Sequence, residues 1–508
     1  MKKALIASLS VAAALALVYL GYTFAQHQVA RPRVVNPGAK TITVRPGDNL
    51  QRALDAAASG DEVVLSSGAT YTGNFVLPVK AGDAFITVRS ARCGELPEGV
   101  RVSPDSAPLM ARLATPNVSP VLRAPAGSHH WRLRCLEFTQ GAAMKGEGYN
   151  LIQLGEGASQ ENQKTLDDAP HHLEFDRVLV RARDDQTAVQ RGITLNSAST
   201  SVTNSHISGI KWAGVETQAL GGWNGPGPFL IENNYLEAAS INILFGGAAP
   251  TIPNLVPSDI VIRNNTLYKR PEWRGRGYAL KNLFELKNAR RVRVTGNVME
   301  NSWADAQTGW AVIFNTFRDA GWEVVEDVTF SGNVIRNVTN GVNLRGLDTG
   351  DTRVRLRRVA VSDNLIELGA HGAGARAFQV LNGSEGVSFD HNTVRGAVSI
   401  ALSLDTAEGF RHADLSFTNN LLPHGEYGVF GNGGAIGTAA LNRFASAWAF
   451  VGNALYARPS GAWPPYPPGN FFPGDEAGTA GLKGADGLPV GVRAQTPAPA
   501  PTARRKAD

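Results

Sequence analysis

An alternation of apolar and polar residues that ends at an asparagine recurs through the second half of this chain. FLIENNYL at 229–236 is one copy and VTFSGNVI at 328–335 is another. In the second copy, Val328 and Phe330 would face one side of a strand and Thr329 the other, as in a half-buried β-strand. The asparagines of the eight copies are Asn234, Asn265, Asn297, Asn333, Asn364, Asn392, Asn420 and Asn453.

These asparagines follow one another at intervals of 28 to 36 residues, a period typical of solenoids, propellers and other repeat arrays. Asparagine suits a tight turn because it tolerates left-handed backbone and bonds to neighbouring main chain. If the repeats stack, the amides of equivalent asparagines can bond to one another as a ladder. We therefore interpret these residues as supports of the turns rather than as catalysts.

A second apolar strand follows each asparagine segment. Two strands and variable loops in each repeat favour a right-handed parallel β-helix. A WD-type propeller has a similar period but would carry a regular Trp-Asp signature, and a leucine-rich repeat would need a recurring leucine framework. The second strands are GITLN (192–196), INILF (241–245), LFELK (283–287), AVIFN (311–315), VNLRG (342–346), FQVLN (378–382) and IALSLD (400–405).

The repeats, together with the opening segment TITVRPGDNLQRALDAAASGDEVVLSSGATYTG at 41–73, resemble bacterial proteins of the pectate-lyase-like superfamily. The resemblance covers about residues 40–458 and implies an all-β, right-handed parallel β-helix. It does not imply one reaction. Asp390 and His391 resemble the Asp-His segment of pectate lyases, but the usual Trp is missing, so we interpret both residues as structural.

The two ends of the chain differ from the repeats. Residues 1–25 combine two lysines, an apolar run and a possible cleavage site, which predicts a signal peptide or an uncleaved membrane anchor. We therefore expect an exported protein, located in the periplasm, outside the cell or on the outer surface. Residues 26–40 are expected to be a linker, and the Pro-rich and Gly-rich residues 459–508 a surface wrap with a disordered tail.

The solenoid is expected to span residues 41–458 and to begin with a cap. An amphipathic pattern from Leu50 to Ala58, preceded by Asp48 and Asn49, predicts a short helix there. Such a helix would cover the open sheet edge of the first coil. We expect the first strand to begin at Glu62.

Long loops on a rigid solenoid are common positions for binding sites. We predict two of them, at 139–172 and at 208–228. The two cysteines, Cys93 and Cys135, can either pair outside the cytoplasm or lie apart as buried thiols. Neither has the spacing of a zinc site. The net charge of +5 is small and not concentrated in a basic run, so we do not expect nucleic acid as a partner. We also expect the protein to be a monomer.

Candidate chemistry lies on the outward face of the second strands. Stacked strands are only about 4.8 Å apart, so Glu285, Lys287, Asn315, Asn343 and Arg345 should gather on one wall. A lyase that acts on a uronate must neutralise the carboxylate and remove the adjacent proton. We assign the base to Lys287 and the carboxylate clamp to Arg345, because arginine offers a bidentate fork.

Glu285 and Asp405 are the predicted partners of the base, or else ligands of a Ca²⁺ ion. Trp223 in the loop GGWNGPGP is a candidate platform for a sugar ring. The same residues can also be read as ordinary surface ion pairs. The further residues expected to bind the glycan are Asn242, Asn315, Asn343, Gln379, Glu216 and Lys281.

Three functions are consistent with this pattern. The first is an exported enzyme that cleaves an acidic, uronate-containing polysaccharide or oligosaccharide by β-elimination. The second is a glycoside hydrolase with Glu216 and Glu285 as its two carboxylates. The third is a non-catalytic glycan-binding or cell-envelope protein, because a fold does not determine a function.

Overall fold

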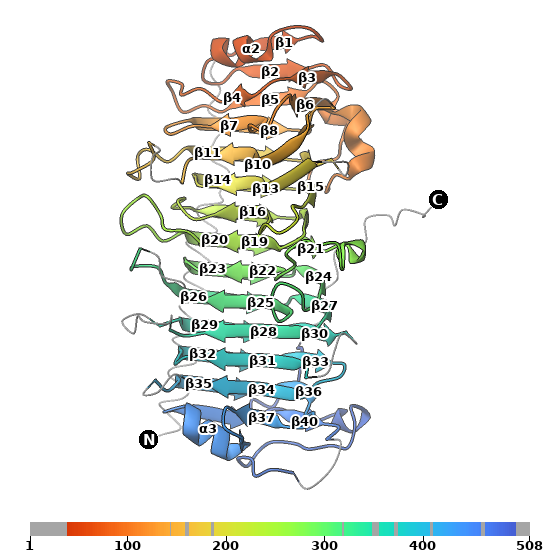
Figure 1. The fold of residues 1–508 in the computed structure, drawn as a ribbon, viewed down its shortest axis with the longest axis vertical. Coiled ribbons are helices and arrows are strands. Elements are labelled where there is room, and N and C mark those ends of the chain that lie inside the picture. The colour runs from red at the N-terminus through yellow and green to blue at the C-terminus, as the bar shows by residue number, and fades with distance from the viewer. Residues whose placement is uncertain are drawn as a thin grey trace.

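The computed structural model is a right-handed parallel β-helix, drawn out into a single column of coils (Figure 1). Its three sheets have 14, 13 and 13 strands. We call the sheet that begins with β1 sheet A, the one that begins with β3 sheet B, and the one that begins with β4 sheet C. The structure describes residues 38–142, 144–157, 162–183, 187–316, 320–347, 355–369, 374–406, 410–458 and 463–493.

Each complete coil contributes three strands rather than the two that the sequence predicts. In one coil these are β26 (Val325–Ser331), β27 (Val334–Val338) and β28 (Asn340–Arg345). The strand after the asparagine was missed because it is short and shows little alternation, as in β21 (Thr266–Tyr268). The alternation predicted for sheet A is confirmed in β26, where Val328 and Phe330 are buried and Thr329 between them is partly exposed. On sheet C the residues predicted to face inward, such as Phe284, Val312 and Val342, are completely buried.

The predicted asparagine ladder is confirmed. The side-chain amide of Asn234 donates to Asn265 Oδ1 at 2.9 Å, and the same contact is repeated from coil to coil. It continues to Asn453, whose amide donates to Asn470 at 3.0 Å. Each ladder amide also donates to a main-chain carbonyl, as Asn333 Nδ2 does to Val294 at 3.1 Å. Asn470 lies in the Pro-rich segment and was not recognised from the sequence.

The N-terminal end is closed by helix α2 (Leu50–Ala56), with Asn49 as its N-cap; the Asn49 side chain accepts a hydrogen bond from Arg52 N at 3.0 Å. The first strand is β1 (Thr41–Val44), ahead of the helix, and it pairs with β2 (Glu62–Leu65). The expectation that the strands begin at Glu62 is therefore wrong. β1 lies ahead of the capping helix, and only its parallel pairing with β2 across that helix makes it part of the sheet.

Both predicted long loops contain sheet C strands. β10 (Gly146–Leu154) lies within 139–172, and β16 (Gln218–Gly222) lies within 208–228. Glycines and polar residues interrupt the alternation in both strands, so neither was recognised as a strand. β16 forms the floor of the pocket described below.

The C-terminal end is closed by helix α3 (Thr438–Phe444) and by residues 463–493. This last segment runs back over the coils, and Arg493 forms an ion pair with Asp363. The predicted signal peptide or anchor at 1–25, most of the linker and the predicted disordered tail lie outside the described residues. Within the described part of the chain, no helix is long and apolar enough to cross a membrane.

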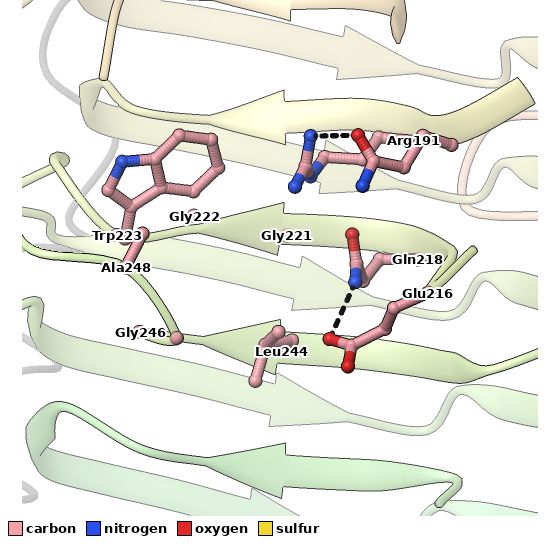
Figure 2. Close-up of a pocket in the computed structure, with 11 residues that line it drawn as sticks. Arg191, Glu216, Gln218, Gly221, Gly222, Trp223, Leu244, Gly246 and Ala248 are labelled. Carbon is pink, nitrogen blue, oxygen red and sulfur yellow. Dashed lines mark hydrogen bonds between the residues drawn. The ribbon is translucent and has the colours of Figure 1, made fainter. Parts of the chain in front are cut away.

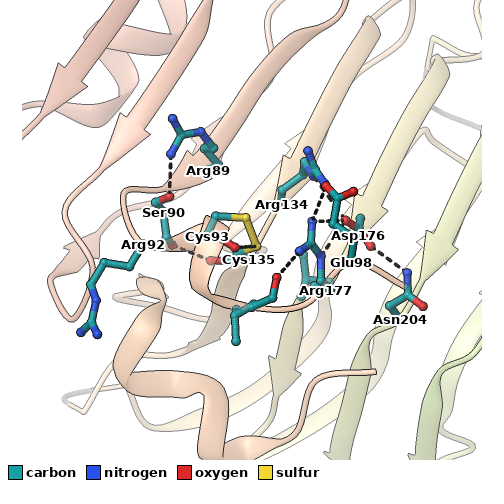
Figure 3. The surroundings of a disulfide bond; sticks show 12 residues. Arg89, Ser90, Arg92, Cys93, Glu98, Arg134, Cys135, Asp176, Arg177 and Asn204 are labelled. Carbon is teal, nitrogen blue, oxygen red and sulfur yellow. Dashed lines mark hydrogen bonds and ion pairs between the residues drawn. A yellow bond between two sulfur atoms is a disulfide. The ribbon is translucent and has the colours of Figure 1, made fainter. Parts of the chain in front are cut away.

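The two cysteines form a disulfide, which decides between the two alternatives left open by the sequence (Figure 3). Cys93 begins a 3-10 turn, and Cys135 follows β8 (His129–Arg134). Both lie in a small apolar cluster with Leu96 and Met110, separate from the main core. The bond ties the 91–110 excursion to the stacked coils, and Arg177 beside it donates to the Leu96 carbonyl at 2.6 Å.

We expect removal of this disulfide to destabilise the N-terminal coils. The bond joins residues 42 positions apart, and a cross-link that closes a loop of this size contributes roughly 2–4 kcal/mol. The Cys93→Ser/Cys135→Ser double variant should therefore unfold at lower denaturant concentration than the parent. A reducing agent should lower the stability of the parent and leave the double variant unchanged; equal stability of the two proteins would contradict the expectation.

Candidate functional site

A pocket of about 220 Å³ indents sheet C where β13 (Thr187–Leu195), β16 and β19 (Ile241–Phe245) lie side by side (Figure 2). Glycines make the hollow, since they place no side chain between Trp223 and Leu244. At Gly246 the backbone also needs glycine, because φ is 91° and a Cβ would lie 2.6 Å from Asn288 N. The lining residues are Gln190, Arg191, Glu216, Gln218, Gly221, Gly222, Trp223, Leu244, Gly246, Gly247 and Ala248.

Trp223 and Arg191 form one wall of the pocket. Trp223 directly follows β16, and its indole Nε1 donates to the Gly157 carbonyl at 3.1 Å. The guanidinium carbon of Arg191 lies 4.9 Å from the centre of a Trp223 ring, a cation–π contact. Burial lowers the pKa of Arg191 to about 10, so the guanidinium is still charged at neutral pH. The pair offers an anchored aromatic surface next to a partly desolvated cation.

Glu216 lies on the opposite side of the pocket from Trp223, two residues before β16 begins. It forms an ion pair with Lys281 and accepts a hydrogen bond from Gln218 Nε2 at 3.1 Å. Burial alone would raise the pKa of Glu216. The hydrogen bond from Lys281 and the charges of Lys287 and Arg191 outweigh burial, and they hold the pKa below its ordinary value. Glu216 is therefore ionised at neutral pH.

Glu285 and Lys287 lie on and just after the next strand, β22 (Phe284–Leu286). Lys287 Nζ is 3.6 Å from Glu285 Oε1. Glu285 is only 2% exposed, and this burial raises its pKa against the opposing charge of Lys287. A Cβ placed on Gly247 would lie 3.8 Å from Lys287 Nζ, so the Lys287 amine borders the pocket. Three basic side chains and two carboxyl groups thus lie in or beside one indentation.

The remaining predicted residues stack on sheet C as expected but lie beyond the pocket. In one row Glu285 pairs with Ile313, which pairs with Asn343 and then Gln379. In the second row Asn315 pairs with Arg345, on β25 (Trp310–Asn315) and β28. The predicted residues therefore do lie on one face of sheet C. Arg345, which was predicted to bind the substrate carboxylate, lies two strands from Lys287. Arg191 lines the pocket instead.

Asp405 and Asn242 do not have the surroundings that the sequence predicts. Asp405 ends β34 (Ile400–Asp405), four strands from Glu285 and thus roughly 19 Å away along the sheet. The two carboxylates therefore cannot hold one ion together. Asn242 is fully buried and not on the wall; its amide donates to two main-chain carbonyls, and its oxygen accepts from the buried Lys269.

Sequence reasoning missed Arg191 and Leu244 as pocket residues. Arg191 lies just before the predicted strand GITLN (192–196), so it was assigned to neither face of a strand. In the structure it lies in the middle of β13, and its side chain lines the pocket. Only the pairing of Arg191 with Gln218 of β16 would have revealed it, and β16 itself had no strand signal.

No protein-family model matches the chain, and no curated protein matches its sequence. Solved structures match over most of it. An alginate lyase from Paenibacillus sp. str. FPU-7 is 17% identical over 72% of this chain and 98% of its own, with a TM-score of 0.37. The PL6 family alginate lyase AlyGC is 12% identical over 85% of this chain and 53% of its own, with a TM-score of 0.45.

The tailspike protein of E. coli bacteriophage HK620, solved in complex with a pentasaccharide, is 14% identical over 81% of this chain and 68% of its own. Its TM-score is 0.41. At identities this low the likeness concerns the fold alone. Any function of this chain therefore has to rest on its own side chains.

Proposed function

We propose that the protein binds an acidic polysaccharide in the sheet C pocket and cleaves it by β-elimination next to a uronate carboxylate. The observation that carries this proposal is the grouping of Arg191, Lys281 and Lys287 around the pocket that Trp223 lines. A flat aromatic ring stacks on a sugar, and cations with limited hydration favour an anionic substrate.

Each step of β-elimination has a group available for it. Arg191, whose guanidinium has a fork geometry, binds the uronate carboxylate and makes the adjacent C–H more acidic. Lys287, as the neutral amine, takes that proton, and the C–H electron pair becomes the new C=C bond. The bond to the leaving sugar oxygen breaks with its electron pair going to that oxygen, which takes a proton from water.

A Ca²⁺ ion is part of the proposal only as an aid to carboxylate binding. Glu285 Oε2, Asn315 Oδ1 and Asn343 Oδ1 are buried and have no hydrogen-bond partner among the described residues. Carboxylate and amide oxygens are the ligands that Ca²⁺ prefers, so the donor types fit. When bound, the ion would supply positive charge for a substrate carboxylate.

We also propose that the protein is exported. The Cys93–Cys135 disulfide supports this, because disulfides persist in oxidising compartments and are rare in the cytosol.

Incubation of the full chain with a panel of uronate polysaccharides tests the function. Ultraviolet absorbance should rise as the unsaturated product forms with at least one of them, in the presence of Ca²⁺ or of a chelator. Neutral glucans and xylans serve as matched substrates without a carboxylate and should give no rise. New reducing ends without the unsaturated product would instead favour hydrolysis by Glu216. Glycan binding without any product would indicate a non-catalytic glycan-binding protein.

A further inference from the structure

Four histidines gather on sheet A, on a different sheet from the pocket. His129 and His130 begin β8, and His171 and His172 begin β11 (His171–Asp176), the next strand of sheet A. The register pairs His171 with His129, so the two His-His pairs lie directly above one another. All four side chains are partly exposed. The strands lie in the orange N-terminal part of Figure 1.

The rings are held close together. His129 stacks on His171 with ring centres 4.9 Å apart, and His130 stacks on His172 at 4.4 Å. Within each pair the Nδ1 atoms are 2.8 Å and 2.7 Å apart. Of two neutral imidazoles joined by such a hydrogen bond, one donates from Nδ1–H and therefore has a bare Nε2, and a bare ring nitrogen is a metal ligand.

The same position in later coils shows what is unusual here. His130 and His172 have positive φ at the start of a sheet A strand, and so do Asp259 and Arg291 further along the sheet. Asp259 and Arg291 stack as opposite charges, with Arg291 Nε 2.7 Å from Asp259 Oδ1. Two histidines cannot neutralise each other in this way.

Ligand atoms of the cluster are close enough to share one ion. Those of His130, His171 and His172 all lie within 4.8 Å of one another, and those of Asp83, His129 and His130 form a second such set. Zn²⁺ bound by nitrogen at about 2.0–2.1 Å holds its ligands roughly 3.4 Å apart in a tetrahedron. Small rotations of the rings would therefore bring three imidazoles onto one ion.

We propose that His130, His171 and His172, with Asp83 and His129 beside them, bind one divalent transition-metal cation of the Zn²⁺ type. Three imidazoles and a carboxylate match the ligand preferences of Zn²⁺, Cu²⁺ and Ni²⁺ and not those of Ca²⁺. The ion would link β8 to β11 on the next coil. β8 ends next to Cys135 of the disulfide. This site is independent of the pocket and of the proposed lyase activity.

Titration of the full chain with Zn²⁺ tests the site, using protein purified without a histidine tag and treated with a chelator. Calorimetry should give saturable binding of one ion per chain, and Co²⁺ in its place should give the visible absorption of a tetrahedral complex. Zn²⁺ should also raise the unfolding temperature. The affinity should fall by at least about 100-fold in the His130→Asn/His172→Asn variant.

Asparagine is chosen because it tolerates the positive φ of both positions, so the fold should survive. Ser199→Asn is the matched control, since Ser199 also has positive φ at the start of the next strand, β14 (Ala198–Thr203), and lies outside the cluster. It should leave Zn²⁺ affinity unchanged. Absence of saturable binding, or equal affinity of the double variant and the parent, would overturn the proposal.

Discussion

Replacing Lys287 by methionine should lower the rate of unsaturated-product formation by about 100- to 10,000-fold, the range that a positioned general base contributes. The amine borders the pocket and lies 3.6 Å from the Glu285 carboxylate. Methionine fills a similar volume but cannot accept a proton. Initial rates at saturating substrate should carry the loss, while binding of the glycan, measured by calorimetry, should change much less.

Lys40→Met is the matched control for this variant. Lys40 is exposed ahead of β1, at the far end of the column from α3, and its loss should leave the rate unchanged. A Lys287→Met protein that is folded by circular dichroism and keeps the parental rate to within about threefold would remove Lys287 from the mechanism. The proposed function itself would then depend on another base in the pocket.

Replacing Asn333 by aspartate should destabilise the protein by about 5 kcal/mol, through the loss of donors in a buried place. The Asn333 amide donates to Val294 O and to Asn364 Oδ1, at 3.1 and 3.0 Å. An aspartate of the same shape would direct a carboxylate at both of these oxygens. It would still accept from Asn297, so the effect isolates the donor side of the ladder. Denaturant unfolding measures the loss.

Asn432→Ala serves as the control for the ladder variant. Asn432 is exposed and makes one long side-chain hydrogen bond, to Asp405 at 3.3 Å, so its loss should cost less than about 0.5 kcal/mol. Hydrogen exchange of Asn333→Asp should show lost protection in the coils on either side of the substitution, because each coil packs only on its neighbours. An unchanged denaturation midpoint would mean that the ladder contributes little stability.

The fold could be predicted because two simple rules repeat along the chain. Alternation identifies the longer strands, and the asparagine marks the turn that joins sheet A to sheet B. The coils before Asn234 were less visible because that position is occupied there by residues such as Val178 and Ser205. Ser205 takes part in the same turn by accepting from Val178 N at 3.0 Å, but a lone serine carries no sequence signal.

The candidate site could be predicted only in part. Trp223 and Glu216 line the pocket, and Lys281 and Lys287 pair with carboxylates beside it. Arg191 was missed because it lies in the part of β13 that precedes the predicted strand at 192–196. The histidine cluster was missed because its ligands come from two strands about 40 residues apart, and only the stacking of coils brings them together.

The way both ends are closed has a consequence for the size of the molecule. Helix α2 covers only the first coil, and Asn470 offers its amide oxygen to Asn453 just as each internal asparagine does to the one before it. Neither terminator depends on how many repeats lie between. Duplication or deletion of a whole repeat should therefore produce a longer or shorter β-helix with intact ends. The length of the molecule can thus change by one coil at a time without any change to the two caps.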